Sequence, residues 1–329
     1  MSFLACRVFQ EGDRVEGRLV RLELDDLGPG EVVIRAAFSG INYKDALAVT
    51  GKGRILKRLP LVAGIDVAGT VAASSDPRFR EGQPVLVTGM GLGETQDGGF
   101  AERVRVPADW VVPMPEGLEL REAMALGTAG FSAALAVHRL ETIGQRPEAG
   151  PIVVTGAAGG VGSIAVAILA ARGYEVIGVS SRKEHHAYLR GLGAAEVSTP
   201  EGLGLGSKAL ERARFGGVVD NVGGTLLSSL LPHVKPWGSV ASVGNAGGPD
   251  LRTTVFPFIL RGVSLLGVSS MDCAMPLRRA LWDQLAGPMK PRDLEAIVSK
   301  VVPLASILGE FEPLLDRRVR GRVLVECAG

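Results

Sequence analysis

The residues that most clearly indicate chemistry form a glycine-rich turn between an apolar run and an apolar helix. Ile152-Val153-Val154 is followed by Thr155-Gly156-Ala157-Ala158-Gly159-Gly160-Val161-Gly162 and then by the apolar stretch 163–172. Glycine at such a turn lets the backbone approach a pyrophosphate, which unpaired N–H groups and the positive end of the helix dipole stabilise. The pattern predicts a dinucleotide site formed by Ala158, Gly159, Gly160 and Val161. Tight packing of a strand on a helix is the alternative.

The strand predicted next, at 175–179, indicates which dinucleotide is bound. An enzyme that uses NAD places Asp or Glu about 20 residues after the glycine turn, where the carboxylate accepts from the ribose 2′-hydroxyl. This chain has Ser180-Ser181-Arg182-Lys183 there. Two hydroxyls and a guanidinium bind a 2′-phosphate, which a carboxylate would repel. The sequence therefore favours NADPH over NADH, with Ser180, Ser181 and Arg182 as ligands. A solvated helix start at Arg182 and Lys183 is the alternative.

Three further loops follow strands predicted at 218–220, 239–243 and 264–268. In doubly wound sheets, ligands lie outside the carboxyl ends of the strands. We therefore expect these loops beside the cofactor, and a plain turn at any one of them is the alternative. The candidate residues are Asn221, Gly244, Asn245, Gly267, Val268 and Ser269.

The elements that must position these residues follow two patterns. Up to about residue 115, short β-rich runs at 19–24, 31–39, 67–73, 84–88 and 101–106 predict a largely antiparallel barrel or sandwich. From residue 121, beginning with a helix at 121–143, helices alternate with buried strands, which predicts a doubly wound α/β sheet. A helix from about residue 277 and a strand at 322–326 follow, and we expect that strand to return to the first domain. The predicted domains are 1–122 and 123–265, with a return segment at 266–329.

Composition and charge limit the partners. Of 329 residues 45 are glycine, roughly twice the ~7% of an average protein. The formal net charge of +1 creates no field that would collect nucleic acid or an anionic membrane. We see no secretion signal, no long apolar segment and no C-x-x-C pair among three cysteines. These features predict a cytoplasmic protein with a small-molecule substrate.

Several longer strings carry a resemblance to a known family. Gly40-Ile41-Asn42-Tyr43-Lys44-Asp45 and Gly127-Thr128-Ala129-Gly130-Phe131 resemble the medium-chain dehydrogenase/reductase superfamily. The strings that resemble its acrylyl-CoA reductase family, long labelled quinone oxidoreductase, are 42–53, Gly64-Ile65-Asp66-Val67-Ala68-Gly69-Thr70-Val71, Asp76-Pro77-Arg78-Phe79 and 257–263. The resemblance implies a GroES-like β-barrel catalytic domain interrupted by a Rossmann domain, NADPH-dependent reduction of acrylyl-CoA to propionyl-CoA, and a homodimer formed through the edge strand at 264–271.

The chain departs from the zinc-containing relatives at the metal positions. Those relatives carry a Cys ligand after a first-domain strand and a Gly-His-Glu string, where this chain reads Asn42-Tyr43-Lys44-Asp45 and Gly64-Ile65-Asp66. Ile65 cannot bind a metal, and the four histidines lack ligand spacing. We therefore predict a reaction without metal, in which hydride adds to the β-carbon of an activated alkene and the thioester carbonyl spreads the developing charge.

Tyr43 is the best candidate for the group that supplies or positions the proton, and packing against the nicotinamide is its alternative role. Asn42 orients substrate or cofactor, or stabilises a turn, whereas Asp45 is expected to be structural. By resemblance, Thr128 lies near the nicotinamide and the three loops line the adenosine and nicotinamide ends of the cofactor.

The phosphates of coenzyme A require cations. Lys52 and Arg54, in a basic run that also includes Lys57 and Arg58, are candidates, as is Arg261. A solvated loop is the alternative reading of the run. Two other functions remain open: an NADPH quinone oxidoreductase, which shares the fold but does not need the basic run, and a non-enzymatic NADPH-binding protein.

Overall fold

The computed structural model describes residues 2–327, which form two compact units. The first unit comprises 1–129, 270–287 and 294–329, and the second comprises 130–269 and 288–293. The units therefore divide at 129/130 and 269/270, where we predicted boundaries at 122/123 and 265/266. The short segment 288–293 rejoins the second unit, which the sequence did not indicate.

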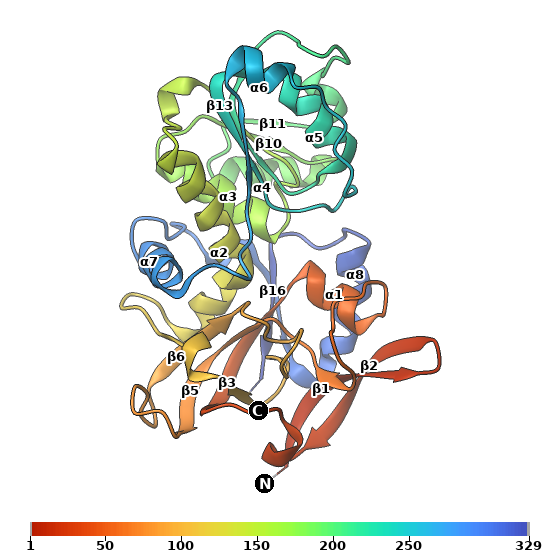
Figure 1. Ribbon diagram of the computed structural model, residues 1–329, viewed down its shortest axis with the longest axis vertical. Helices are drawn as coiled ribbons and strands as arrows, with labels where there is room; N and C mark the ends of the chain where they lie inside the picture. Colours follow the sequence, from red (N-terminus) through yellow and green to blue (C-terminus); the bar gives the residue numbers. More distant parts are fainter. Residues whose placement is uncertain (1, 328–329) are drawn as a thin grey trace. The chain divides into compact units, whose positions relative to one another are not determined.

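The first unit contains a small sheet and a large one (Figure 1). The small sheet has the order β2-β1-β4 and is antiparallel. The large sheet has the order β15-β16-β3-β5-β6-β8, and β7 also pairs with β3. The strands are β1 (Phe3–Glu11), β2 (Arg14–Leu22), β3 (Val32–Ile41), β4 (Leu61–Val62), β5 (Asp66–Ser74), β6 (Pro84–Thr88), β7 (Arg103–Val106), β8 (Val112–Pro113), β15 (Val298–Pro303) and β16 (Arg322–Glu326).

The last strand pairs with a strand from the beginning of the chain. β16 runs antiparallel to β3, with Leu324 opposite Gly40, so the predicted return of this strand to the first domain is confirmed. The helices of this unit are α1 (Tyr43–Val49), α7 (Met275–Ala286) and α8 (Phe311–Leu315), together with the first part of α2 (Leu120–Thr142). Buried side chains from distant segments form the core, such as Phe100 and Phe311, whose ring centroids are 6.0 Å apart.

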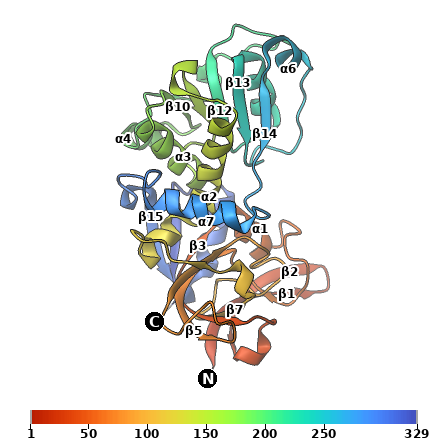
Figure 2. The ribbon, with the colours of Figure 1, turned by 60° about the vertical axis from the view of Figure 1, so that its left-hand side comes forward.

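The second unit is built on a six-stranded parallel sheet with the order β11-β10-β9-β12-β13-β14. Figure 2 shows several of these strands running side by side. The strands are β9 (Ile152–Val154), β10 (Val176–Val179), β11 (Glu196–Ser198), β12 (Phe215–Asp220), β13 (Val234–Ser242) and β14 (Ser264–Gly267). The helices are the rest of α2, α3 (Gly160–Ala171), α4 (His186–Gly191), α5 (Gly224–Leu230) and α6 (Phe256–Arg261). The predicted doubly wound α/β sheet is confirmed.

Helix α3 is apolar because it is buried on most of its surface. Residues 162–169 of this helix are all buried, and β9 and β10 beside it are fully buried as well. Strands buried on both faces read as continuous hydrophobic runs, as expected for a parallel sheet. Within the described residues, no helix combines the length and apolar composition needed to cross a bilayer.

Candidate functional site

The glycine turn predicted from the sequence connects β9 to α3. Gly156 has a φ of 57°, in the left-handed region that favours glycine. A Cβ at Gly162 would lie 2.3 Å from the carbonyl oxygen of Gly156, so the turn closes only with glycine there. The N–H groups of Gly160, Val161 and Gly162 belong to the first turn of α3 and have no acceptor within the helix. They can therefore bind an anion, as expected for a pyrophosphate.

The predicted 2′-phosphate ligands lie together at the carboxyl end of β10. The backbone N–H of Ser180 donates to Ser198, which continues the sheet by one residue, and the N–H of Arg182 donates to the Ser180 hydroxyl at 3.3 Å. The Arg182 side chain is 38% exposed and pairs with Glu184 at 3.4 Å. His185 lies beside them, with Nδ1 at 3.5 Å from the Ser180 hydroxyl. A partly exposed guanidinium and two hydroxyls thus follow this strand, since Ser181 is exposed as well.

The loop after β12 is held by a buried carboxylate. Asp220 accepts from the Thr155 hydroxyl at 2.6 Å and from the N–H of Gly223 at 2.8 Å, and burial raises its pKa. Asn221 donates to the Thr155 carbonyl at 2.8 Å. Its Oδ1 atom is buried without a hydrogen-bond partner among residues 2–327. Since buried acceptors are normally satisfied, this atom is suited to a polar ligand beside the glycine turn.

The remaining loops meet at the same edge of the sheet. The N–H groups of Gly244 and Gly247 donate to the carbonyls of Asp220 and Val222, which ties the loop after β13 to the loop after β12. Val268 donates to Ser242 at 3.0 Å, so the segment after β14 extends in the same direction. Because the strands are parallel, the structure brings the second-unit candidates together at their carboxyl ends. These candidates are Ala158, Gly159, Gly160, Val161, Ser180, Ser181, Arg182, Asn221, Gly244, Asn245, Gly267, Val268 and Ser269.

Two candidates of the first unit lie at the start of α1. Asn42 is the N-cap, and its backbone N–H donates to Asp45 at 2.8 Å as part of a capping box. The Asn42 amide donates to Asp66 at 2.8 Å and accepts from Arg322 at 3.0 Å. This geometry favours the turn-stabilising role of Asn42 over contact with substrate. Tyr43 is the first residue of the helix and is 39% exposed, so its phenol is accessible.

Thr128 lies next to a kink in α2. Gly127 has φ 51° and ψ −154°, which interrupts the helix. The backbone N–H of Thr128 donates to Asp66 at 3.0 Å and its hydroxyl donates to the same carboxylate at 2.6 Å. Burial, followed by the charge of Asp66, raises the pKa of Asp45 to about 7. Thr128 thus belongs to a buried polar cluster that consists of Asn42, Asp45, Asp66, Thr128 and Arg322. Tyr43 directly follows Asn42 in the chain and so adjoins the same cluster.

This cluster does not fit a zinc ion. Ile65 is apolar and 3% exposed, and Asp66 is already surrounded by the donors of Asn42, Thr128 and Arg322. No group of three or more His, Cys, Asp or Glu side chains within 2–327 could hold a metal ion.

The basic residues predicted to bind coenzyme A phosphates differ in how they are engaged. Lys52 pairs with Glu312 at 2.6 Å, and both side chains are about half exposed. Arg54 lies in the same loop and is exposed. Arg261 instead donates to the carbonyl groups of Pro232, Val234 and Glu211. Its guanidinium is engaged in holding backbone segments together, which argues against Arg261 as a ligand of the coenzyme A phosphates.

Three buried charged residues were given no role by the sequence analysis. Asp66 and Arg322 are 0% and 2% exposed, and Arg278 is fully buried. Arg278 donates to the carbonyls of Thr88 and Ser270 at 2.7 Å, so it connects the start of the return segment to the end of β6. Asp66 lies within a string that carries the resemblance and Arg322 begins the strand predicted at 322–326, but charged side chains ordinarily predict exposure.

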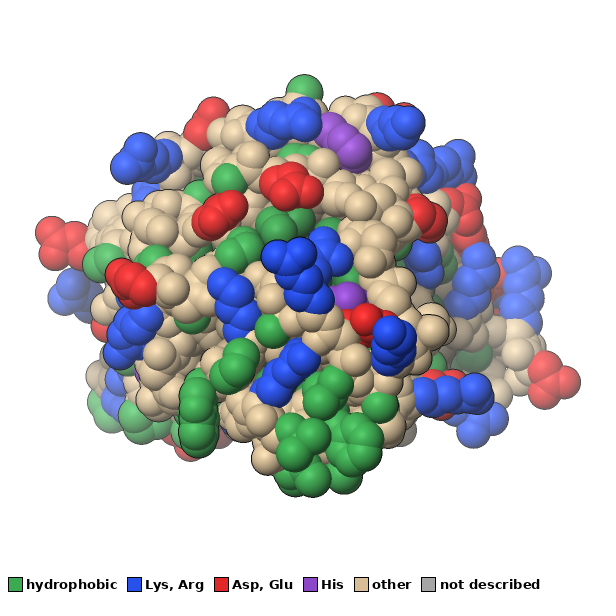
Figure 3. Space-filling view, turned by 90° about the horizontal axis from the view of Figure 1, so that it is seen from above, with side chains coloured by type: hydrophobic (Ala, Val, Ile, Leu, Met, Phe, Trp, Pro, Cys, Tyr) green, Lys and Arg blue, Asp and Glu red, His purple; other side chains and the backbone are tan. Residues whose placement is uncertain are grey.

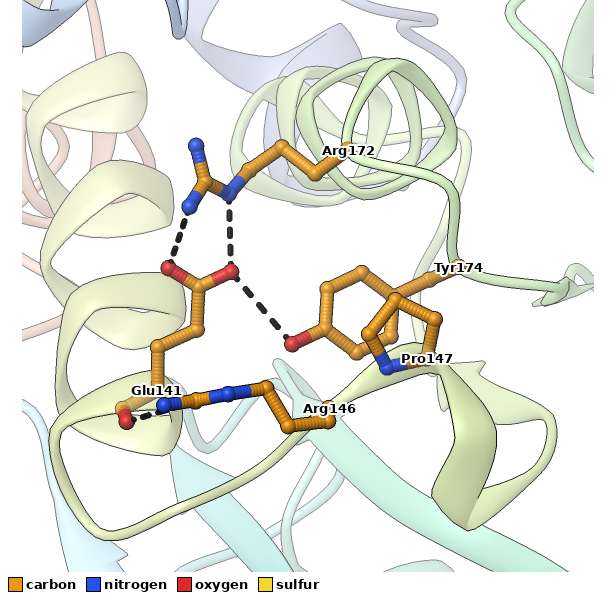
Figure 4. Close-up of a pocket in the computed structure, with 5 residues that line it drawn as sticks. All are labelled: Glu141, Arg146, Pro147, Arg172 and Tyr174. Atoms are coloured by element: carbon orange, nitrogen blue, oxygen red, sulfur yellow. Dashed lines mark hydrogen bonds and ion pairs between the residues drawn. The ribbon is translucent and has the colours of Figure 1, made fainter.

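A surface pocket in the second unit is lined by residues outside the predicted site. It has a volume of about 290 Å³ and is lined by Glu141, Arg146, Pro147, Arg172 and Tyr174. Figure 4 shows the Glu141 carboxylate bound by the Arg172 guanidinium and the Tyr174 hydroxyl, at 2.6–3.3 Å. Burial and this carboxylate raise the pKa of Tyr174 to about 12. The polar groups satisfy one another, which indicates a structural ion pair.

Comparisons with known proteins agree with this architecture. Residues 28–116 match the family model of the alcohol dehydrogenase GroES-like domain, and 160–286 match that of zinc-binding dehydrogenase. The chain is 47% identical over 325 residues to "Putative quinone oxidoreductase YhfP" of Bacillus subtilis, covering 98% of each chain. It is 44% identical to "Acrylyl-CoA reductase AcuI" of Ruegeria pomeroyi, covering 96% of each.

Solved structures of such relatives contain nicotinamide cofactors. The yhdH oxidoreductase from Salmonella enterica in complex with NADP has a TM-score of 0.95 and 43% identity, covering 99% of this chain and 100% of that one. Bacillus subtilis yhfP with NAD bound also has a TM-score of 0.95, with 45% identity and 99% coverage of both chains. The relatives thus differ in the cofactor that their structures hold.

Proposed function

The chain belongs to the acrylyl-CoA reductase family of the medium-chain dehydrogenase/reductase superfamily, and on this premise we propose that it reduces acrylyl-CoA to propionyl-CoA with NADPH. The observation that carries the proposal is the 44% identity to an acrylyl-CoA reductase over 96% of both chains. In this reaction hydride adds to the β-carbon of the alkene and a proton adds to the α-carbon, so that the carbon–carbon double bond becomes a single bond.

The second unit offers the groups that would hold NADPH. The free N–H groups at the start of α3 suit the pyrophosphate, and Ser180, Ser181 and Arg182 suit the 2′-phosphate. The orphaned Oδ1 of Asn221 supports a polar ligand at the same sheet edge. When bound, NADPH supplies the hydride. The dinucleotide preference follows from the absence of a carboxylate at Ser180 and Ser181.

In the first unit we assign to Tyr43 the delivery of the proton that adds to the α-carbon. Its phenol is partly exposed, and α1 is held at its first residue by the Asn42 capping box. A phenol can donate to the α-carbon directly or fix a water molecule that does so. Asn42 acts through the helix, because its amide is committed to Asp66 and Arg322.

For the phosphates of coenzyme A we propose Arg54 and Lys52. Both lie in the loop after α1, and both side chains reach solvent. Arg54→Glu should raise the KM for acrylyl-CoA about tenfold, because a charge-assisted contact is replaced by repulsion. Arg80→Glu, an equal charge change at another exposed position of the first unit, is the control. An unchanged KM in Arg54→Glu and Lys52→Glu would remove this phosphate site.

The alternative substrate is a quinone, as the name of the Bacillus subtilis relative indicates. A small hydrophobic acceptor does not need the cations at Lys52 and Arg54. The decisive experiment is steady-state oxidation of NADPH with acrylyl-CoA, crotonyl-CoA and a quinone in parallel. We expect the highest kcat/KM for a thioester, and a quinone that equals or exceeds both thioesters would overturn the proposed substrate.

We further propose a homodimer formed through the second unit. Strand β14 is the last strand of the parallel sheet, and next to it lies an exposed apolar patch. The patch consists of Trp237, Phe256, Ile259 and Leu260, which are 84%, 44%, 68% and 62% exposed. Figure 3 shows a cluster of exposed hydrophobic side chains at one edge of the face, beside others that are scattered over it. Such a patch next to an open strand suits a second copy of the chain.

The cysteines support a reducing compartment. Cys6, Cys273 and Cys327 are buried free thiols. Thiols of this kind persist where glutathione and thioredoxin keep cysteine reduced, so we propose that the enzyme works in the cytoplasm.

A further inference from the structure

We infer that Asp66 and Arg322 form a buried positioning pair that holds the start of α1, with Tyr43, in a defined place relative to the kink of α2, with Thr128. The pair lies wholly within the first unit. The kinetic part of the test rests on the proposed function, whereas its spectroscopic part needs no substrate.

Asp66 connects the two elements directly. Its carboxylate accepts from the Asn42 amide at 2.8 Å, and Asn42 is the N-cap that precedes Tyr43. It also accepts from the backbone N–H and the hydroxyl of Thr128, at 3.0 and 2.6 Å. With 0% exposure, the carboxylate cannot exchange these donors for water. A displacement of Asp66 therefore moves the N-cap of α1 and the turn of α2 together.

Arg322 spans the same two elements from the other side. Its guanidinium donates to the Ile41 carbonyl and to the Asn42 side-chain oxygen at 3.0 Å, both just before α1. It donates to the carbonyls of Ala125 at 3.2 Å and Met124 at 3.5 Å, in the turn of α2 before the kink. Its ion pair with Asp66 has a separation of 3.5 Å. The planar guanidinium thus donates to backbone carbonyls that have no hydrogen-bond partner within their own helix or strand at these ends.

Two glycines make room for the pair. A Cβ at Gly127 would lie 2.5 Å from the Asp66 carboxylate and 2.8 Å from the Arg322 guanidinium. A Cβ at Gly40 would lie 2.3 Å from the same guanidinium. Since Gly127 also adopts the positive φ of the kink, the backbone of both elements is shaped around these two side chains.

Stability alone does not account for the pair. Replacing a buried ion pair by apolar groups of similar volume is often neutral or stabilising, because both charges lose their hydration on burial. Burial lowers the pKa of Arg322, which reflects this cost. What an apolar pair could not supply is a set of directional bonds to Asn42, Thr128 and the carbonyls on both sides. A positioning role uses those bonds.

The test compares single and double variants. Asp66→Asn replaces the carboxylate that accepts these hydrogen bonds, and Arg322→Lys removes the planar guanidinium. Each should lower kcat at least about tenfold, because displacement of a reacting group by about 1 Å can lower the rate about 10²-fold. The KM for NADPH should change less than about threefold, since the cofactor ligands of the second unit are untouched. The double variant Asp66→Asn/Arg322→Met removes both charges and should recover the thermal midpoint lost by a single variant without recovering kcat.

A spectroscopic readout follows Tyr43 itself. The chain has three tyrosines, Tyr43, Tyr174 and Tyr188, so 3-fluorotyrosine labelling gives a small set of ¹⁹F resonances that Tyr43→Phe assigns. We expect the Tyr43 resonance to shift or broaden in Asp66→Asn and Arg322→Lys while that of Tyr174 stays in place. If Asp66→Asn fails to fold, Thr128→Val removes the hydroxyl contact without unbalancing the charges and should move the same resonance.

The control is a second buried carboxylate of the first unit. Asp97 is 1% exposed, accepts from the N–H groups of Gly28 and Val62, and pairs with Arg58. Asp97→Asn should lower the thermal midpoint and leave the Tyr43 resonance unchanged. An unmoved Tyr43 resonance in the Asp66 and Arg322 variants, or a kcat that recovers together with stability in the double variant, would overturn the inference. If the wild type reduces no thioester, the proposed function fails, but the ¹⁹F measurement still tests the positioning role of Asp66 and Arg322.

Discussion

Arg182 offers the most direct test of cofactor recognition. Its side chain lies at the carboxyl end of β10, is 38% exposed, and touches Glu184 at 3.4 Å. Arg182→Ala therefore removes a cation and its donors without opening the core. Because only NADPH carries the 2′-phosphate, the substitution should weaken the binding of NADPH and leave the binding of NADH nearly unaffected.

The size of the effect follows from the exposure of the guanidinium. A hydrogen bond to a charged group contributes about 1.5–3 kcal/mol net, and salt and solvent reduce this at an exposed position. We therefore expect Arg182→Ala to cost about 1–2 kcal/mol of binding free energy, which corresponds to an increase of about 5- to 30-fold in the dissociation constant of NADPH. For NADH we expect a change below about twofold, since no contact is lost.

Two neighbouring residues provide matched variants. Lys183 is exposed and adjacent, so Lys183→Ala measures the loss of a nearby charge without the fork of Arg182. Glu184 is 68% exposed and competes with the phosphate for the Arg182 guanidinium. Glu184→Gln should therefore strengthen NADPH binding modestly, and this gain should vanish when Arg182 is also replaced.

The assay is a titration of each variant with NADPH and NADH by calorimetry at low and moderate salt. A 2′-phosphate contact predicts that the Arg182→Ala effect on NADPH shrinks as salt rises. Equal losses for both cofactors would refute the assignment. The outcome is informative for the family, since one related structure holds NADP and another holds NAD.

Further predictions concern the proton, the buried acid and the apolar patch. Tyr43→Phe should lower kcat about 10²-fold if the phenol supplies the proton, with little change in the KM for NADPH, and a wild-type rate would leave Tyr43 a packing residue. The raised pKa of Asp45, about 7 against an ordinary 3.8, means that its stabilising contribution is complete below about pH 4 and is lost as pH rises to about 7, at about 1.4 kcal/mol per pH unit. Urea unfolding from pH 4 to 8 should show this slope, and Asp45→Asn should flatten it; an unchanged slope would contradict the burial argument. Trp237→Ser should shift sedimentation velocity profiles toward the monomer, whereas Ile143→Ser, at another exposed apolar position, should not.

The cofactor edge was predictable because its signals are local. The turn from β9 to α3 depends on glycines close together in the chain: Gly156 adopts a positive φ, and Gly162 packs against the backbone of Gly156 and Ala157. The loops after β12 and β13 follow from the rule for parallel sheets, which needs only the order of strands. The first hairpin was not predicted at 3–11 because Ala5 and Cys6 are buried in succession, which breaks the alternation that marks a half-buried strand.

The buried cluster was not predictable, because its members acquire their roles only when the chain has folded. Asp66 and Arg322 are separated by 256 residues, and a charged residue by itself predicts a solvated position. The pairing of β16 with β3 brings Arg322 beside Ile41, and β5 brings Asp66 beside the start of α1. The same arrangement surrounds the Asp66 carboxylate with donors from Asn42, Thr128 and Arg322. Because these donors come from the start of α1, the kink of α2 and β16, we infer that the Asp66 carboxylate holds in place the helix that carries Tyr43.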